Sequence, residues 1–247
     1  MGNRNSTDKV KRNPSINKTN NRSHIKKEQH AHHFIKRYLF QSYFSAPIVI
    51  GEGVKVLDVG CGAGTWLLDL ANEYKDSIFY GLDIAPVFPA EKNGIMRFLN
   101  LSGRVTKPEG YMELSEAYYN KNEGFGPIYI KLAEAIYKSS LQRGVDLKFT
   151  DQLESVLRSR QTIMNVDIDE KVVIIGPNGG KVGTIFMDLY IQFCSTDSAV
   201  EGLCPYLNMS KDEYKEFIFK DYRNEICQSK NTKLYMVRYW AQKVNNN

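Results

Sequence analysis

The sequence of 247 residues lacks two features that would place it in a membrane or in a secretory pathway. No apolar run approaches the roughly 18 residues that a membrane-spanning helix needs, and the N-terminal region has no apolar signal stretch. The four cysteines form no CxxC pair. We therefore expect reduced thiols without disulfides in a cytoplasmic protein, with the nucleus as the alternative compartment.

An excess of positive charge is lacking outside the N-terminal region. The formal net charge is +5, but residues 1 to 30 hold eight basic and two acidic residues, which is +6 and leaves about −1 for the remainder. This distribution argues against a nucleic-acid-binding face on the folded part. It predicts a disordered basic tail at residues 1–27, followed by one domain at 28–247.

Histidine is confined to one short stretch. His24, His30, His32 and His33 are the four histidines of the chain, and they border the basic tail. A metal site needs further ligands and a fixed scaffold, so we expect no bound metal here.

Hydrophobic periodicity predicts an α/β fold. An amphipathic helix starts at Glu28 and ends before Pro47, and a β-branched run at Val54 to Val59 reads as a buried strand. A helical stripe from Leu67 to Tyr74 and a second strand at Ile78 to Leu82 follow. Together these segments have the size of one parallel βαβ unit.

The remaining two thirds of the chain alternate between helix and strand signals. The predicted strands lie at 110–114, 162–175 and 233–241, and the predicted helices lie near 129–136, 147–157 and 182–193, with a further one that a capping box opens at Ser210. The segment IIGPNGGKVG does not have the spacing of a phosphate-binding loop, and we interpret it as a turn between a strand and a helix.

The stretch KVLDVGCGAGTW at residues 55–66 carries the strongest functional signal. Gly60, Gly62 and Gly64 have the spacing GxGxG, which lets the backbone turn tightly at the end of a strand and approach a ligand closely. Asp58 precedes the turn by two residues, where a carboxylate would repel a pyrophosphate. The pattern favours a cationic nucleoside over a dinucleotide.

A second acidic residue supports the same ligand. Asp83 ends the second predicted strand and is placed to accept hydrogen bonds from two ribose hydroxyls, while Ile84 is placed to pack on the adenine. S-adenosylmethionine carries an ammonium and a sulfonium and no phosphate, so it fits both carboxylates. We interpret Cys61 as a small turn residue that contributes its backbone amide. The predicted cofactor-binding residues are Asp58, Gly60, Cys61, Gly62, Asp83 and Ile84.

These motifs resemble the class I S-adenosylmethionine-dependent methyltransferases. VLDVGCGAGTW is similar to their first motif, YGLDIAP to the acidic loop after strand two, and RVTKPEGYMEL to the entry to strand five, while the flanking segments resemble a fungal branch. The resemblance runs from about Glu28 to the C-terminus. It implies a Rossmann-like sheet with helices on both faces, S-adenosylmethionine as cofactor, and methyl transfer to an unidentified small-molecule acceptor.

The sequence departs from that family between the second and third predicted strands. Only 26 residues, 84 to 109, lie where the family has two further strands with their helices. We therefore expect an internally shortened sheet that lacks core strands three and four. The alternative function is that of a truncated, non-catalytic homologue acting at most as a binding or interaction module.

No catalytic residue is assigned from the sequence. A base could help to deprotonate a hydroxyl or amine acceptor, and the candidates are Tyr111, Glu113 and Glu116, near the end of the third predicted strand, where acceptors bind in the family. Alternate residues of a strand face opposite sides of the sheet. The competing interpretation of each of the three residues is therefore that its side chain faces solvent. The oligomeric state is not predicted.

Overall fold

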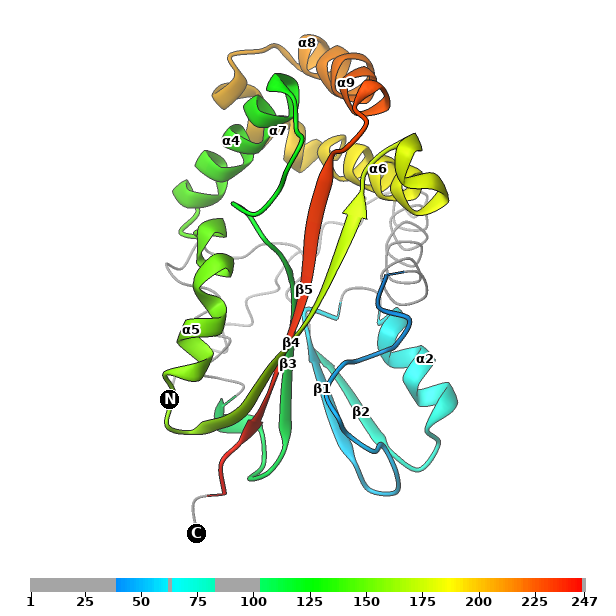
Figure 1. Ribbon diagram of the computed structural model, residues 1–247, viewed down its shortest axis with the longest axis vertical. Helices are drawn as coiled ribbons and strands as arrows, with labels where there is room; N and C mark the ends of the chain where they lie inside the picture. The colour runs from blue at the N-terminus through cyan, green and yellow to red at the C-terminus, as the bar shows by residue number, and fades with distance from the viewer. Residues whose placement is uncertain (1–38, 62–63, 83–102, 246–247) are drawn as a thin grey trace, which may run out of the picture.

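The structure is a computed structural model that describes residues 39–61, 64–82 and 103–245 (Figure 1). The predicted basic tail at 1–27, the four histidines and most of the helix predicted from Glu28 lie outside the described residues. Gly62, Asp83 and Ile84 lie outside them as well. The predicted α/β class is confirmed, because the described strands form a parallel pair joined through a helix and a separate antiparallel sheet.

The predicted βαβ unit is present. β1 (Lys55–Val59) and β2 (Ile78–Leu82) pair in parallel, and α2 (Thr65–Glu73) connects them. Leu70 of α2 is fully buried, whereas the outer positions of the two strands remain open to solvent. One helix therefore covers one face of this two-stranded sheet.

The second sheet has three antiparallel strands. β3 (Tyr111–Ala117), β4 (Ile163–Ile174) and β5 (Lys233–Lys243) pair in the order β3-β5-β4, so the C-terminal strand is central. A bulge interrupts the pairing of β4 between Met164 and Asp167. All three strands match predicted strands: β3 and β5 run further toward the C-terminus than predicted, whereas β4 is one residue shorter at each end.

Helices gather at one end and along one side of the three-stranded sheet (Figure 1). They are α4 (Pro127–Gln142), η2 (Leu147–Gln152), α5 (Leu153–Arg158), η3 (Pro177–Gly179), α6 (Gly180–Cys194), α7 (Asp197–Leu207), α8 (Lys211–Glu216), η4 (Phe217–Tyr222) and α9 (Arg223–Gln228). The predicted capping box of Ser210 and Glu213 opens α8, and η4 is a π-helical stretch that continues into α9. None of the helices in the described ranges is long and apolar enough to cross a membrane.

Most of the buried apolar surface lies between these helices and the three-stranded sheet. Leu132, Ile191 and Ile226 belong to the main core, and a smaller core forms around Leu153 and Tyr239 where α5 packs on the opposite face. Within the described part of the βαβ unit, Leu70 is the single fully buried apolar side chain. The two regions of the molecule thus differ strongly in packing.

The described strands do not join into one continuous sheet. β1 and β2 pair only with each other, and the three later strands form their own ladder. Residues 83–102, which hold most of the stretch where strands three and four are predicted to be missing, lie outside the described residues. The internally shortened sheet therefore stays a prediction.

The segment that precedes β1 differs from the prediction. The sequence predicts a helix up to Pro47, but residues 42–46 are irregular in the structure. Backbone groups of Ser42, Ser45 and Ala46 bond to side chains of the three-stranded sheet instead of to a helical turn. Periodicity could not reveal this, because the competing partners lie far away in the sequence.

Candidate functional site

The glycine turn between β1 and α2 is open to close approach. Gly60 has a φ of 86° and Gly64, the N-cap of α2, has a φ of 72°, both in the region that favours glycine. No heavy atom of the described chain lies within 4 Å of the position that a Cβ would take at either residue. Ligand atoms can therefore reach the backbone here, as a nucleoside-binding turn requires.

Backbone hydrogen bonds hold this turn to the end of β2. The amides of Gly60 and Cys61 donate to the Leu82 carbonyl at 2.7 and 3.3 Å, and the Gly64 amide donates to the Cys61 carbonyl at 2.8 Å. The Cys61 amide, which the sequence suggested as a ligand contact, thus has a structural partner. A Cβ placed on Gly81 would lie 2.9 Å from the Cys61 sulfur, so this side chain packs against β2.

Asp58 lies at the carboxyl end of β1 and is half-buried. It pairs with Gly81, and a Cβ on Gly81 would point at the Leu67 side chain of α2. Directly opposed residues project to the same face of a sheet, so the Asp58 side chain lies on the face that α2 covers. Its carboxylate is two residues from the open turn.

Thr65, the first residue of α2, was not singled out by the sequence. Its hydroxyl oxygen is buried and has no hydrogen-bond partner among the described residues. Buried polar atoms nearly always have partners, so an unpaired hydroxyl beside an open turn is what a bound polar ligand would satisfy. A sequence signal existed, because Thr at a helix start usually caps that helix, whereas Gly64 holds the capping position here.

Glu113, one of the candidate bases, forms hydrogen bonds with the backbone of the segment before β1. Its Oε2 accepts hydrogen bonds from the amides of Ser45 and Ala46 at 2.7 and 2.9 Å, and its Oε1 lies 3.6 Å from Nε of Arg238. Burial raises the pKa of Glu113, and this effect outweighs the lowering by the two amides and by Arg238. These contacts hold the Glu113 carboxylate against the segment before β1.

The other two candidates do not gather with Glu113. Glu116 projects to the opposite face of β3, and burial raises the pKa of its carboxyl group. The Tyr111 ring packs against Trp240 with ring centroids 6.0 Å apart. The structure therefore does not bring the three predicted candidates into one catalytic group.

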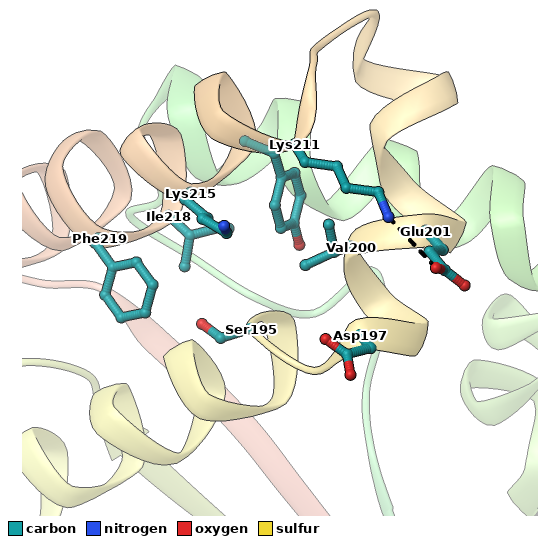
Figure 2. Close-up of a pocket in the computed structure, with 9 residues that line it drawn as sticks. Ser195, Asp197, Val200, Glu201, Lys211, Lys215, Ile218 and Phe219 are labelled. Atoms are coloured by element: carbon teal, nitrogen blue, oxygen red, sulfur yellow. Dashed lines mark hydrogen bonds and ion pairs between the residues drawn. The ribbon is translucent and has the colours of Figure 1, made fainter.

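Two hollows lie among the helices, away from the glycine turn. The first, of about 220 Å³, lies between α7 and α8 with Val200, Tyr214 and Ile218 in its wall, and Lys211 reaches Glu201 at 3.4 Å across its rim (Figure 2). The second, of about 440 Å³, lies around Lys131 and Asn208. Neither is lined by a residue of the turn.

The fold and the turn together define an α/β protein whose βαβ unit carries an open glycine turn. No family model matches the sequence. It shares 47% identity over 36 residues with the secondary metabolism regulator laeA of Aspergillus flavus, and 46% over 35 residues with the protein-methionine methyltransferase laeA of Emericella nidulans. The matched segments cover 15% and 14% of this chain, and only 10% and 9% of the length of the two relatives.

Two of the similar solved structures are methyltransferases by name. One is phosphoethanolamine N-methyltransferase 2 of Haemonchus contortus in complex with phosphomonomethylethanolamine and S-adenosylhomocysteine. Its sequence identity to this chain is 14% and the TM-score is 0.44, and the match covers 88% of this chain and 53% of the Haemonchus chain. Another is an S-adenosylmethionine-dependent methyltransferase of Geobacter sulfurreducens with S-adenosylhomocysteine, at 13% identity and a TM-score of 0.41, covering 78% and 86%.

Proposed function

We propose that this protein binds S-adenosylmethionine at the glycine turn and transfers its methyl group to a small-molecule acceptor. The binding residues in this proposal are Asp58, Gly60, Cys61, Gly62, Asp83 and Ile84, of which Gly62, Asp83 and Ile84 lie outside the described residues. We add Thr65 to these residues, because its buried hydroxyl has no hydrogen-bond partner in the described chain.

The single observation that carries the proposal is the open turn. Gly60 and Gly64 both have positive φ and unfilled space beside them, at the carboxyl end of a parallel strand that carries a carboxylate two residues earlier. Open α/β sheets bind ligands at this edge, and the carboxylate favours a cationic ligand over a phosphate. The orphan hydroxyl of Thr65 supports the same location.

The residues of this chain have a limited chemical task in such a reaction. When bound, the cofactor supplies a methyl group activated on a sulfonium, and the carbon–sulfur electrons pass to sulfur as the acceptor's lone pair forms the new bond. The acceptor's proton leaves to solvent or to a base. Asp58 and the turn would orient the donor, and no nucleophile is needed from the protein.

Calorimetry with S-adenosylhomocysteine tests the binding part. Asp58→Asn removes the carboxylate beside the turn, and Asp76→Asn is the matched control, because Asp76 lies in the turn that precedes β2, at the opposite end of the same unit. We expect saturable binding by the native chain, about tenfold weaker binding by Asp58→Asn and unchanged binding by Asp76→Asn. Equal affinities in all three would refute the carboxylate's role.

Turnover separates the proposed enzyme from a non-catalytic binding module. S-adenosylmethionine with a labelled methyl group is incubated with the chain and a pool of small-molecule extracts, and label is followed in products and in S-adenosylhomocysteine formed. Transfer that Asp58→Asn weakens supports the enzyme. Tight cofactor binding without transfer to any acceptor would support the binding module.

A further inference from the structure

A partly buried charged cluster fastens the irregular segment Ser42–Ala46, here called the strap, to the three-stranded sheet. Arg238 of β5 is only 4% exposed, and its guanidinium lies 4.1 Å from the centre of the Phe40 ring. One of its terminal nitrogens donates to the Ser42 carbonyl at 3.1 Å and to the Ser42 hydroxyl at 3.2 Å. Burial lowers the pKa of Arg238, against the opposing effect of Glu113 and Asp169.

Two acidic residues complete the cluster from the neighbouring strands. Glu113 of β3 accepts hydrogen bonds from the amides of Ser45 and Ala46, and Asp169 of β4 accepts one from the Ser45 hydroxyl at 2.9 Å. Each strand of the sheet thus contributes one charged side chain to the strap. Hydrogen bonds to charged groups are the stronger ones, and loss of one partner from a buried charged cluster leaves another charge uncompensated.

The strap also contacts the glycine-turn unit. The Tyr43 carbonyl, in the middle of the strap, accepts a hydrogen bond from Nε1 of Trp66 at 3.0 Å. Trp66 is the second residue of α2, directly after the glycine turn. Through these side-chain hydrogen bonds the strap links the βαβ unit to the three-stranded sheet.

We propose that Glu113, Asp169 and Arg238 are positioning residues, which set the start of α2 for ligand binding through the strap and Trp66. The identity of the ligand in this proposal rests on the proposed function. The coupling between the charged cluster and the start of α2 through the strap does not depend on which ligand binds. Without the strap, Trp66 would lose its hydrogen bond to Tyr43, and the position of Thr65 beside the turn would be less restricted.

Glu113→Ala tests the coupling, with Glu116→Ala as the matched control. Both remove a half-buried glutamate of β3, but only Glu113 contacts the strap. We expect Glu113→Ala to speed chymotrypsin cleavage after Phe40, Tyr43 or Phe44, and to weaken S-adenosylhomocysteine binding about tenfold. Glu116→Ala should change neither. Faster strap cleavage with affinity unchanged within about twofold would overturn the coupling.

Trp66→Phe is the second arm, and alone it keeps the test possible if Glu113→Ala does not fold, because an affinity unchanged within about twofold in Trp66→Phe would overturn the proposal. It removes only the donor to Tyr43, and Trp240→Phe is its control because Trp240 is the other tryptophan of the chain. Trp66→Phe should weaken binding about tenfold, and its effect should not add to that of Glu113→Ala. Full additivity would show that the two residues act separately and would overturn the proposal.

A ligand-independent readout separates this proposal from the proposed function. In the Trp240→Phe background, all tryptophan emission comes from Trp66, and Glu113→Ala should shift that emission to longer wavelength as the strap leaves. If the native chain does not bind S-adenosylhomocysteine, the proposed function fails, while an emission shift still supports the coupling. Unchanged emission in Glu113→Ala would overturn the coupling whatever the binding result.

Discussion

The two glycine-rich turns of this protein use glycine for opposite reasons. At Gly60 and Gly64, after β1, the space that a side chain would fill is open and φ is positive. At Gly179 and Gly183, after β4, a Cβ would overlap the carbonyl oxygen of Ile174. The first turn keeps its backbone accessible, whereas the second brings a helix and a strand into direct contact.

The same difference extends to the regions that hold the turns. The βαβ unit exposes Leu57, Tyr80 and Leu82 on its outer face, and parallel sheets are normally covered on both faces. The buried large apolar side chains of the described chain lie almost all in the three-stranded sheet and its helices. The most recognisable motif of the sequence thus lies in the more thinly packed region, so binding and folding stability should respond to different substitutions.

The largest expected contrast is between two leucines on helices. Leu132 of α4 is 0% exposed and Leu68 of α2 is 62% exposed. Leu132→Ala should lower the free energy of unfolding by about 3 kcal/mol through lost packing and a residual cavity, and Leu68→Ala by about 0.5 kcal/mol or less. Urea unfolding followed by circular dichroism measures both. Losses of equal size would show that the βαβ unit is packed as tightly as the helical region.

Substitution of one glycine in each turn gives the next largest effect. Alanine in a helix is normally better than glycine by about 1 kcal/mol, but at Gly183 its methyl group would meet the carbonyls of Ile174 and Gly176. Gly183→Ala should therefore destabilise the fold by about 2 kcal/mol and leave S-adenosylhomocysteine affinity unchanged in the folded fraction.

Gly60→Ala should show the reverse pattern. The strain of a positive φ costs about 1 kcal/mol, but the added methyl group also occupies the open space beside the turn and should weaken binding at least about tenfold. Gly180→Ala is the control, because Gly180 also has a positive φ and open space but lies at the second turn. Weaker binding in Gly180→Ala would mean that backbone strain, and not the place of the turn, explains the loss.

Local patterns in the sequence predicted most of the secondary structure correctly. The βαβ unit, the capping box at Ser210 and the turn at 176–180 each depend on residues close together in the chain, so periodicity and turn chemistry suffice to predict them. The predicted cofactor residues stay a prediction, because half of them lie outside the described residues.

Long-range contacts explain what the sequence did not reveal. The strap was predicted as the end of a helix, yet Ser45 bonds to Glu113, 68 residues away, and Ser42 to Arg238, 196 residues away. No local pattern signals such partners, so Glu113 was interpreted as a candidate base. Sequence periodicity also could not tell that the βαβ unit would keep one exposed apolar face, because β-branched strands predict burial on both faces.

The smallest expected effect concerns the pH dependence of stability in the well-packed region. Burial raises the pKa of Glu116 above its value in the unfolded chain, so the folded state binds this proton more tightly. The contribution of Glu116 is therefore fully present below the unfolded pKa and is lost as pH rises through the folded pKa. Glu116→Gln should remove this slope and be more stable than the native chain at neutral pH, measured as urea midpoints across pH 4 to 8.

Glu123 provides the control of opposite sign. Its hydrogen bonds from Lys233, at 3.0 Å, and Tyr235, at 2.9 Å, lower its pKa, so its contribution is present above the unfolded pKa and is lost as pH falls. Glu123→Gln should thus lose stability relative to the native chain at neutral pH and approach it in acid. If Glu116→Gln behaved like Glu123→Gln, Glu116 would have a charged partner that lowers its pKa. The packed region and the surface would then shift the pKa of a carboxyl group in the same direction.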